Sequence, residues 1–362
     1  MPFSTVDHQH MSRALELAVR GLNTTQPNPR VGCVIVHDGE VVGEGWHQRA
    51  GEPHAEIHAL RAAGETARGA TAYVTLEPCS HHGRTPPCVD AVIAAGVTRV
   101  VIASTDTNPR ASGGIDKLRA AGITVDTGLL QDDARELNIG FFSRFERGRP
   151  WVRVKLAMSL DGRTALANGE SKWITGEAAR ADVQRWRARA SAIVTGSGTV
   201  LADDPHLTAR VDEPVMPLLR VVLDRRLRTP ADSHLLDGSE PTLLLHGAAT
   251  SADDARFAAV ECAAIAERDG QLDLAAVLAE LARRSCNEVQ VESGPTLCGA
   301  LFAAGLVDEL LLYIAPILLG DAARPLLHLP PLTAMADCWQ LQIVDQQPFG
   351  PDLRLRLRPR SR

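Results

Sequence analysis

The chain has 362 residues, of which 45% are hydrophobic, and a formal net charge of −6 at pH 7. This length is about twice that of a typical domain, so we expect two domains. No segment reaches the roughly 18 apolar residues of a membrane span, the N-terminus lacks the features of a signal peptide, and the acidic balance gives no general attraction to nucleic acid. We therefore expect a cytoplasmic protein with a small-molecule partner and no membrane or nucleic-acid partner; whether it forms a homo-oligomer is left open.

Up to about residue 128, apolar residues alternate between helical and strand periods, which is typical of α/β units with a mostly parallel sheet. Two strands at 31–36 and 40–46 are joined at Asp38-Gly39, a sequence that favours a tight hairpin turn. The other expected elements are helices at 10–21, 54–63, 88–95 and 114–121 and strands at 71–77, 99–104 and 123–128.

A mixed stretch from 138 to 151 ends in Gly-Arg-Pro, which indicates a junction, and we predict domains at 1–145 and 146–362. A second α/β pattern follows this junction, and the alternating "LRLRLRP" near the end predicts a closing antiparallel strand. The expected strands are 151–159, 191–197, 218–224, 241–247, 288–294 and 309–316, and the expected helices are 176–189, 272–284 and 295–304.

The stretch "GEPHAEIHALRAAG" places His54, Glu56 and His58 at the start of an expected helix. His54 and His58, four residues apart, share one helix face, a spacing that can hold a metal. His54 and Glu56 converge only on a target above the helix N-terminus. Further on, Cys79 ends a strand and Cys88 begins a helix, where the dipole stabilises a thiolate.

One His and two Cys would fill three positions of a zinc tetrahedron and leave the fourth for water, which is typical of a catalytic site. Two alternatives remain: His54 is an ordinary core histidine, or the metal site is purely structural. The other cysteines are expected to pack as reduced thiols rather than form disulfides. They are Cys33, Cys262, Cys286, Cys298 and Cys338.

His54-Ala55-Glu56, followed by Pro78-Cys79 and a second Cys, resembles the zinc deaminase signature. The eight residues "SHHGRTPP" between Cys79 and Cys88 depart from the usual two. This insertion, with "PNPRVGCVIV" and "GWHQRAGEPHAE", resembles the bifunctional riboflavin-biosynthesis deaminase/reductase family. The resemblance implies a cytidine-deaminase-like α/β/α sandwich in which His54, Cys79 and Cys88 bind Zn²⁺ and Glu56 is the general acid/base. His58 then packs.

The same resemblance suggests that Asn28 contacts the substrate, although "PNP" also reads as an ordinary turn. The inserted loop carries His81, His82 and Arg84, which could meet a substrate phosphate or simply be exposed polar residues.

The second domain lacks the G-x-G-x-x-G pattern of a Rossmann site. It has glycine turns at Gly196-Ser-Gly198 and Gly294, each between a strand and a helix, where backbone N–H groups can approach phosphates. Without further support, both turns are ordinary. Arg187 and Arg210 suit a phosphate monoester, although each could be a solvated charge.

The stretches "VKLAMSLDGRTA", "GSGTVLADDPHLTAR" and "VESGPTLCGALFAAGLVDEL" resemble the reductase half of the same family. The resemblance implies a dihydrofolate-reductase-like α/β domain that uses NADPH, with Lys155 and Asp161 as candidate polar groups at the reacting sugar. The implied cofactor contacts are Ala157, Trp173, Thr199, Asp203, Gly294, Pro295, Thr296, Leu297, Cys298, Gly299 and Ala300. The implied substrate contacts are Ser171, Arg187, Leu207, Arg210 and Glu292.

We therefore predict two successive steps of riboflavin biosynthesis. Zinc hydroxide deaminates 2,5-diamino-6-ribosylamino-4(3H)-pyrimidinone 5′-phosphate, and NADPH then reduces 5-amino-6-(5-phosphoribosylamino)uracil to the ribitylamino phosphate. One alternative keeps the deaminase with an inactive or binding-only C-terminal domain. Another is a nucleic-acid-editing deaminase, which the acidic balance disfavours because it requires a basic face.

Overall fold

The computed structural model describes residues 3–81 and 86–360, which form two compact units, Met1–Gly148 and Arg149–Arg362. The expected boundary after residue 145 falls inside helix α6 (Ile139–Arg147). This segment was expected to be a mixed junction. Its Phe141 and Phe142 are instead buried in the N-terminal core, so the helix belongs to the first unit.

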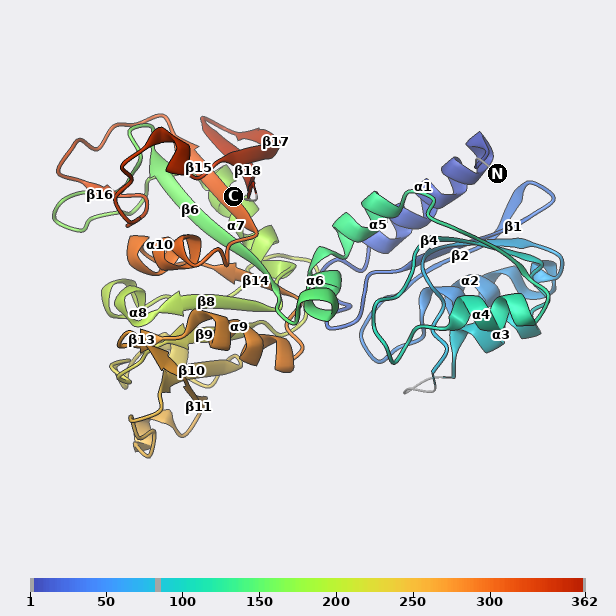
Figure 1. The fold of residues 1–362 in the computed structure, drawn as a ribbon, viewed down its shortest axis with the longest axis horizontal. Coiled ribbons are helices and arrows are strands. Elements are labelled where there is room, and N and C mark those ends of the chain that lie inside the picture. Colours follow the sequence, from blue (N-terminus) through green and yellow to red (C-terminus); the bar gives the residue numbers. More distant parts are fainter. Residues whose placement is uncertain (1–2, 82–85, 361–362) are drawn as a thin grey trace. The chain divides into compact units, whose positions relative to one another are not determined.

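The N-terminal unit is built on a five-stranded sheet with the order β2-β1-β3-β4-β5 (Figure 1). Half of its pairings are antiparallel, where a mostly parallel sheet was expected: β1 runs antiparallel to β2, as the predicted hairpin requires, and also to β3, which was not predicted. The hairpin turn forces the first pairing: Asp38 and Gly39 both have positive φ, as a tight two-residue turn requires. The strands are β1 (Gly32–His37), β2 (Glu40–Trp46), β3 (Thr71–Leu76), β4 (Arg99–Ser104) and β5 (Thr124–Thr127).

Helices cover both faces of this sheet because successive strand residues point to opposite sides. Cys33 and Ile35 of β1 pack with one group of helices, whereas Val34 and Val36 pack with the other. The first group is α2 (Ala55–Ala63), α3 (Cys88–Ala94), α4 (Gly114–Ala120) and α6; the second is α1 (Thr5–Val19) and α5 (Gln131–Leu137). The unit is therefore the expected α/β/α sandwich.

The C-terminal unit contains a nine-stranded sheet with the order β11-β10-β9-β8-β14-β6-β15-β18-β17. Strands β11 to β15 in that order pair in parallel, and β18 pairs antiparallel with β15 and β17, as the alternating C-terminal pattern predicts. The strands are β6 (Trp151–Ser159), β8 (Ala192–Gly196), β9 (Leu219–Leu223), β10 (Thr242–Gly247), β11 (Glu261–Ile265), β14 (Glu288–Val291), β15 (Glu309–Ala315), β17 (Leu341–Phe349) and β18 (Asp352–Pro359).

The helices of this unit follow the parallel strands and pack on the sheet, which is the arrangement expected for α/β folds. They are α7 (Glu177–Ala188), α8 (Ser197–Asp203), α9 (Leu274–Arg283) and α10 (Pro295–Ala303). Short strand pairs are formed by β7 (Arg163–Ala165) with β16 (Arg324–Pro325) and by β12 (Glu267–Arg268) with β13 (Gln271–Leu272). Single 3₁₀ turns lie at Gly64–Ala67, His234–Leu236, Ala255–Phe257 and Met335–Asp337. Among the described helices, none is long and apolar enough to cross a membrane.

Candidate functional site

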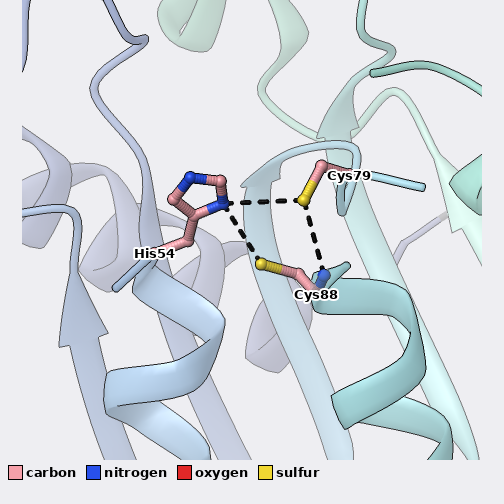
Figure 2. Close-up of side chains that lie close together, drawn as sticks. All are labelled: His54, Cys79 and Cys88. Carbon is pink, nitrogen blue, oxygen red and sulfur yellow. Dashed lines mark hydrogen bonds between the residues drawn. The ribbon is translucent and has the colours of Figure 1, made fainter. Parts of the chain in front are cut away.

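The structure brings His54, Cys79 and Cys88 together, as Figure 2 shows. His54 is the residue that precedes α2, Cys79 follows β3, and Cys88 is the first residue of α3. The His54 Nδ1 atom lies 3.2 Å from the Cys88 sulfur and 3.6 Å from the Cys79 sulfur. A tetrahedral zinc with ordinary Zn–N and Zn–S bonds holds such atoms about 3.5 Å apart. The three side chains therefore fit a zinc ion without rearrangement.

Glu56 lies beside this cluster in the first turn of α2 and is 4% exposed. Its Oε2 atom is buried and has no hydrogen-bond partner among the described residues. An orphaned carboxylate oxygen is costly unless a ligand or water completes it. Burial raises the pKa of Glu56 to about 6, which places the carboxyl group close to the range in which it can both accept and release a proton.

The cysteines affect each other's protonation. Hydrogen bonding with Cys88 lowers the pKa of Cys79 to about 4, and the same interaction raises the pKa of Cys88. The hydrogen bond with Cys79 also raises the pKa of His54. These side chains therefore share protons, and a bound cation would displace them because cysteine ligates metal as thiolate and histidine as the neutral ring.

His47 is a site residue that the sequence analysis did not single out, although it stands in the quoted stretch "GWHQRAGEPHAE". Its ring packs edge-on against His54, with the ring centres 5.1 Å apart. The Asn28 amide lies 3.1 Å from His47 Nε2, and His47 Nδ1 lies 3.2 Å from the carbonyl of Pro53. Burial lowers the pKa of His47 to about 4, so the ring is neutral at pH 7. Asn28, predicted to contact substrate, therefore reaches the metal-binding cluster through His47.

A loop beyond β4 closes over Cys79, and Glu77 organises it. The buried Glu77 carboxylate accepts hydrogen bonds from the backbone N–H groups of Asp106, Gly113 and Ile115 at 3.0–3.1 Å. A side chain at Gly114 would place its Cβ 2.0 Å from the carbonyl oxygen of Pro78, so only glycine allows this approach. Burial raises the pKa of Asp106 to about 6.

The remaining predicted residues of this unit lie outside the cluster. His58 is partly buried one turn further along α2, and its Cβ closely approaches Gly45 of β2. His81 is exposed at the edge of the inserted loop. The predictions for His82 and Arg84 lie outside the described residues.

The C-terminal unit has a cleft of about 1530 Å³. Most of the predicted cofactor and substrate residues line it. They are Ala157, Ser171, Trp173, Arg187, Thr199, Asp203, Leu207, Arg210, Glu292, Gly294, Pro295, Thr296, Leu297 and Ala300.

Cys298 and Gly299 are not among the residues that line the cleft. The Cys298 thiol donates to the carbonyl of Ser293 and packs in the core. This agrees with the prediction that Cys298 is a packing thiol, and not with the cofactor contact that the family resemblance implies. A Cβ on Gly299 would lie 2.1 Å from the carbonyl oxygen of His328, so this glycine serves close packing of α10. Asp161 is also outside the lining and accepts hydrogen bonds from the N–H groups of Leu319 and Gly320.

Two residues predicted to bind substrate, Arg187 and Glu292, bind each other. The guanidinium group donates two hydrogen bonds to the carboxylate, at 2.7 and 2.8 Å, and a third at 2.9 Å to the carbonyl of Thr208. Burial would raise the pKa of Glu292, but Arg187 and Lys155 outweigh it and hold the pKa at about 2. Burial lowers the pKa of Lys155 against the opposing effect of Glu292. The cleft thus contains a partly buried group of three charged residues.

The chain matches two family models, one in each unit. Residues 4–104 match the cytidine and deoxycytidylate deaminase zinc-binding region, and residues 150–355 match the RibD C-terminal domain. The riboflavin biosynthesis protein RibD of Escherichia coli is 52% identical over 97% of this chain and 99% of its own length. The chain belongs to the RibD family. The relative from Haemophilus influenzae is 48% identical over the full length of both chains.

Solved structures also support membership of the RibD family. The Acinetobacter baumannii RibD, form 1, aligns with a TM-score of 0.92 and 45% identity over 98% of this chain and 99% of that one. A deaminase/reductase from Thermotoga maritima aligns with a TM-score of 0.88 and 32% identity over 98% and 99%. The predicted family, fold class and bifunctional enzyme are confirmed: the chain joins a zinc-binding deaminase domain to a reductase domain of riboflavin biosynthesis.

Proposed function

We propose that the N-terminal unit deaminates 2,5-diamino-6-ribosylamino-4(3H)-pyrimidinone 5′-phosphate and that the C-terminal unit reduces the resulting 5-amino-6-(5-phosphoribosylamino)uracil with NADPH. The proposal is supported by the Thermotoga maritima relative, which is described as a diaminohydroxyphosphoribosylaminopyrimidine deaminase and 5-amino-6-(5-phosphoribosylamino)uracil reductase. The observation that carries the proposal is the buried Glu56 oxygen without a partner beside three side chains spaced for zinc.

For deamination, His54, Cys79 and Cys88 would hold zinc, which supplies hydroxide at neutral pH by lowering the pKa of bound water. Glu56 would move two protons in turn at Oε2: the first, taken from the attacking water, goes to the pyrimidine ring nitrogen, and the second, taken from the hydroxyl group that this water leaves on the ring, goes to the amino group that departs as ammonia. Its pKa near 6 suits both transfers. Neutral His47 supports His54 edge-on, and Asn28 fixes the His47 ring through Nε2.

For reduction, the nicotinamide of NADPH supplies the hydride, and the residues of the cleft orient the two reactants and exclude water. Lys155 and Glu292 are our candidates for the contacts to the sugar, because they are electrostatically coupled in the cleft: the ionised Glu292 would accept hydrogen bonds from the sugar hydroxyl groups, and Lys155 would supply the proton that accompanies the hydride. Arg187 keeps Glu292 ionised and positioned. Arg210 is exposed and offers its guanidinium to the substrate phosphate.

The backbone N–H groups at the start of α10 suit the cofactor pyrophosphate. This nine-residue helix begins at Pro295 on the cleft, and a helix N-terminus favours phosphate through its free N–H groups and its dipole. A cytoplasmic location stays a prediction of the sequence.

A coupled assay tests the proposal. Purified protein is given the diaminopyrimidine substrate, and ammonia release, NADPH oxidation and zinc content are followed together. We expect about one zinc per chain, and NADPH oxidation only after deamination has begun. A metal-free preparation with full deaminase activity would contradict the assigned site. Ammonia release with no oxidation of NADPH or NADH would instead support the binding-only C-terminal unit.

A further inference from the structure

The segment that carries Asn28 lies between α1 and β1 and consists of turns rather than of a helix or a strand. Within it, the Asn28 N–H donates to the carbonyl of Thr25 at 2.8 Å. A connecting segment of this kind keeps one conformation only where other elements hold it. The position of the Asn28 side chain therefore depends on the contacts that fix this segment from outside.

One of these contacts is a clamp that Asn138 forms on the backbone of Arg30. The Arg30 N–H donates to Asn138 Oδ1 at 2.8 Å, and Asn138 Nδ2 donates to the Arg30 carbonyl at 2.9 Å. The two residues are 108 positions apart, and Asn138 is 2% exposed. An amide side chain that satisfies both backbone groups of one residue takes the place of a neighbouring strand. Asn138 lies between α5 and α6, so the clamp ties the segment to this helix junction.

The buried side chain of Arg30 strengthens the same attachment. Its Nε donates to the carbonyl of Leu22 at 3.1 Å, and its Nη1 donates to the carbonyl of Leu137 at 2.8 Å. The first hydrogen bond closes the segment on itself, and the second reaches the last residue of α5. Because the guanidinium group is planar and rigid, it holds these carbonyl groups in one geometry. Arg30 and Asn138 together therefore fix the segment to the end of α5.

The clamped segment continues to the metal cluster. The Asn28 amide lies 3.1 Å from His47 Nε2, and the His47 ring packs edge-on against His54. The backbone N–H of His47 also donates to the carbonyl of Val31, at the end of the same segment, at 2.9 Å. A shift of the segment would therefore move the groups that hold His47. A misplacement of about 1 Å at a catalytic site can cost about 10²-fold in rate.

We propose that Asn138 and Arg30 are positioning residues of the deaminase site and that they act through Asn28. This inference rests on the proposed deamination. Asn138 and Arg30 hold the turn, Asn28 holds the His47 ring, and His47 supports His54. A clamp with a purely structural role would instead stabilise the unit and leave the kinetics of the folded protein unchanged.

A double-mutant cycle tests the route through Asn28. We expect Asn138→Ala to lower kcat/KM of deamination by about 10- to 100-fold with the zinc content unchanged. In a chain that already carries Asn28→Ala, the same substitution should cost less than about threefold, because effects are not additive when one residue acts through another. An equal loss in both backgrounds would overturn the proposal. A lower melting temperature of Asn138→Ala with unchanged kinetics would also overturn it.

Two further variants separate positioning from folding. Arg30→Lys keeps the charge and the backbone clamp but loses the planar geometry, and it replaces Asn138→Ala in the cycle if that variant does not fold. Tyr73→Phe is the matched control, because it removes a buried hydrogen bond of 2.8 Å to Asp7 in the same unit. The Tyr73 ring packs with α1 and α5, not with the helices that carry metal ligands. We expect Tyr73→Phe to lower the melting temperature and to leave deamination and zinc content unchanged.

A measurement without turnover separates this inference from the proposed function. Nitrogen NMR of zinc-loaded protein with isotope-labelled histidine reports the hydrogen bond at His47 Nε2, and a His47→Gln variant identifies the signal. We expect Asn138→Ala to shift this signal in the same direction as Asn28→Ala, and Tyr73→Phe to leave it in place. If the shift appears in a protein that releases no ammonia from the diaminopyrimidine, the proposed function fails and the positioning stands. An unshifted His47 signal in Asn138→Ala would overturn the positioning itself.

Discussion

Each unit has a glutamate at its candidate site, and the surroundings shift the pKa values of the two carboxyl groups in opposite directions. Glu56 has a raised pKa of about 6 and one oxygen without a partner. Glu292 has a pKa of about 2 because Arg187 and Lys155 outweigh its burial. A carboxyl group that must exchange protons benefits from the first environment, whereas one that must stay ionised and hold hydroxyl groups benefits from the second.

The same contrast extends to how each site is assembled. Three ligand atoms within 4.8 Å of one another define the N-terminal cluster. The C-terminal cleft of about 1530 Å³ instead spreads recognition over many side chains. A single substitution should therefore abolish the first activity, whereas substitutions in the cleft should have graded effects.

Loss of one ligand should produce the largest effect. Cys88→Ser replaces a fully buried sulfur at the start of α3 with a poor zinc ligand. We expect zinc to be lost and deamination to fall below detection, with reduction of supplied 5-amino-6-(5-phosphoribosylamino)uracil unchanged. Elemental analysis and the two separate assays measure this. Cys33→Ser is the matched control, since Cys33 is a buried thiol of the same unit that is not one of the three clustered residues. Bound zinc with normal deamination in Cys88→Ser would remove the basis of the contrast.

Glu56→Gln should be nearly as damaging but through a different route. The amide keeps the size of the side chain but cannot exchange the proton. We expect zinc content to remain and the deamination rate to fall by about 10²- to 10⁴-fold, as for loss of a general acid/base. The kcat of deamination and the metal content, measured on the same sample, distinguish this from the ligand variant. An active Glu56→Gln protein would reduce the cluster to a structural metal site.

The sequence predicted the metal site better than the cleft for a physical reason. Zinc accepts few ligand types in one geometry, so His54, Cys79 and Cys88 are recognisable from their order alone. Dinucleotides and sugar phosphates are bound by many individually weak contacts. Thus the pairing of Arg187 with Glu292 depends on how α7 packs beside the end of β14, and the core position of Cys298 depends on helix packing. Neither leaves a local signal.

The fold, like the two sites, was predicted where a local sequence pattern determines the structure and was missed elsewhere. Apolar periodicity predicted most strands and helices, but it missed α5. It also read α6 as a junction because of the Gly-Arg-Pro that follows, although the phenylalanines of "GFFSRFER" are spaced for one face of a helix. It also missed the role of His47, whose significance comes from edge-on contact with His54 seven residues away. In the first sheet the hairpin of β1 and β2 was predicted correctly, but the antiparallel pairing of β1 with β3 was not, because no local signal marks a pairing between strands so far apart in the sequence.

Arg187→Ala should affect stability as well as reduction. Both partners of this ion pair are 13% exposed, and removal of Arg187 leaves a buried carboxylate with no bidentate donor. Breaking a buried pair costs about 3–5 kcal/mol. We expect that loss in the free energy of unfolding of the C-terminal unit, measured by urea titration, together with weaker reduction and normal deamination. In Arg187→Ala/Glu292→Ala the cost should be partly recovered. A variant with full stability and only a raised substrate KM would show that Arg187 serves the phosphate directly.

The smallest expected effect is the pH dependence that separates the two glutamates in zinc-free protein. Burial raises the pKa of Glu56 from 4.5 to about 6, so its contribution to stability is fully present below pH 4.5 and is lost as the pH rises through 6. The loss is about 2 kcal/mol by neutral pH. Glu56→Gln should therefore gain about that much relative to the parent chain between pH 4 and pH 7.5.

The contribution of Glu292 to stability changes with pH in the opposite direction. Its lowered pKa contributes stability that is present above pH 4.5 and is lost only as the pH falls through about 2. Most of this contribution is already present at pH 4, so Glu292→Gln should be less stable than the parent by an amount that grows only slightly up to about pH 5.5 and then stays constant to pH 7.5. Urea titrations of both variants at pH 4, 5, 6 and 7.5 provide the comparison. If the two variants shifted in the same direction, the two carboxylates would share one environment, and the division between a proton-exchanging and a permanently charged glutamate would not hold.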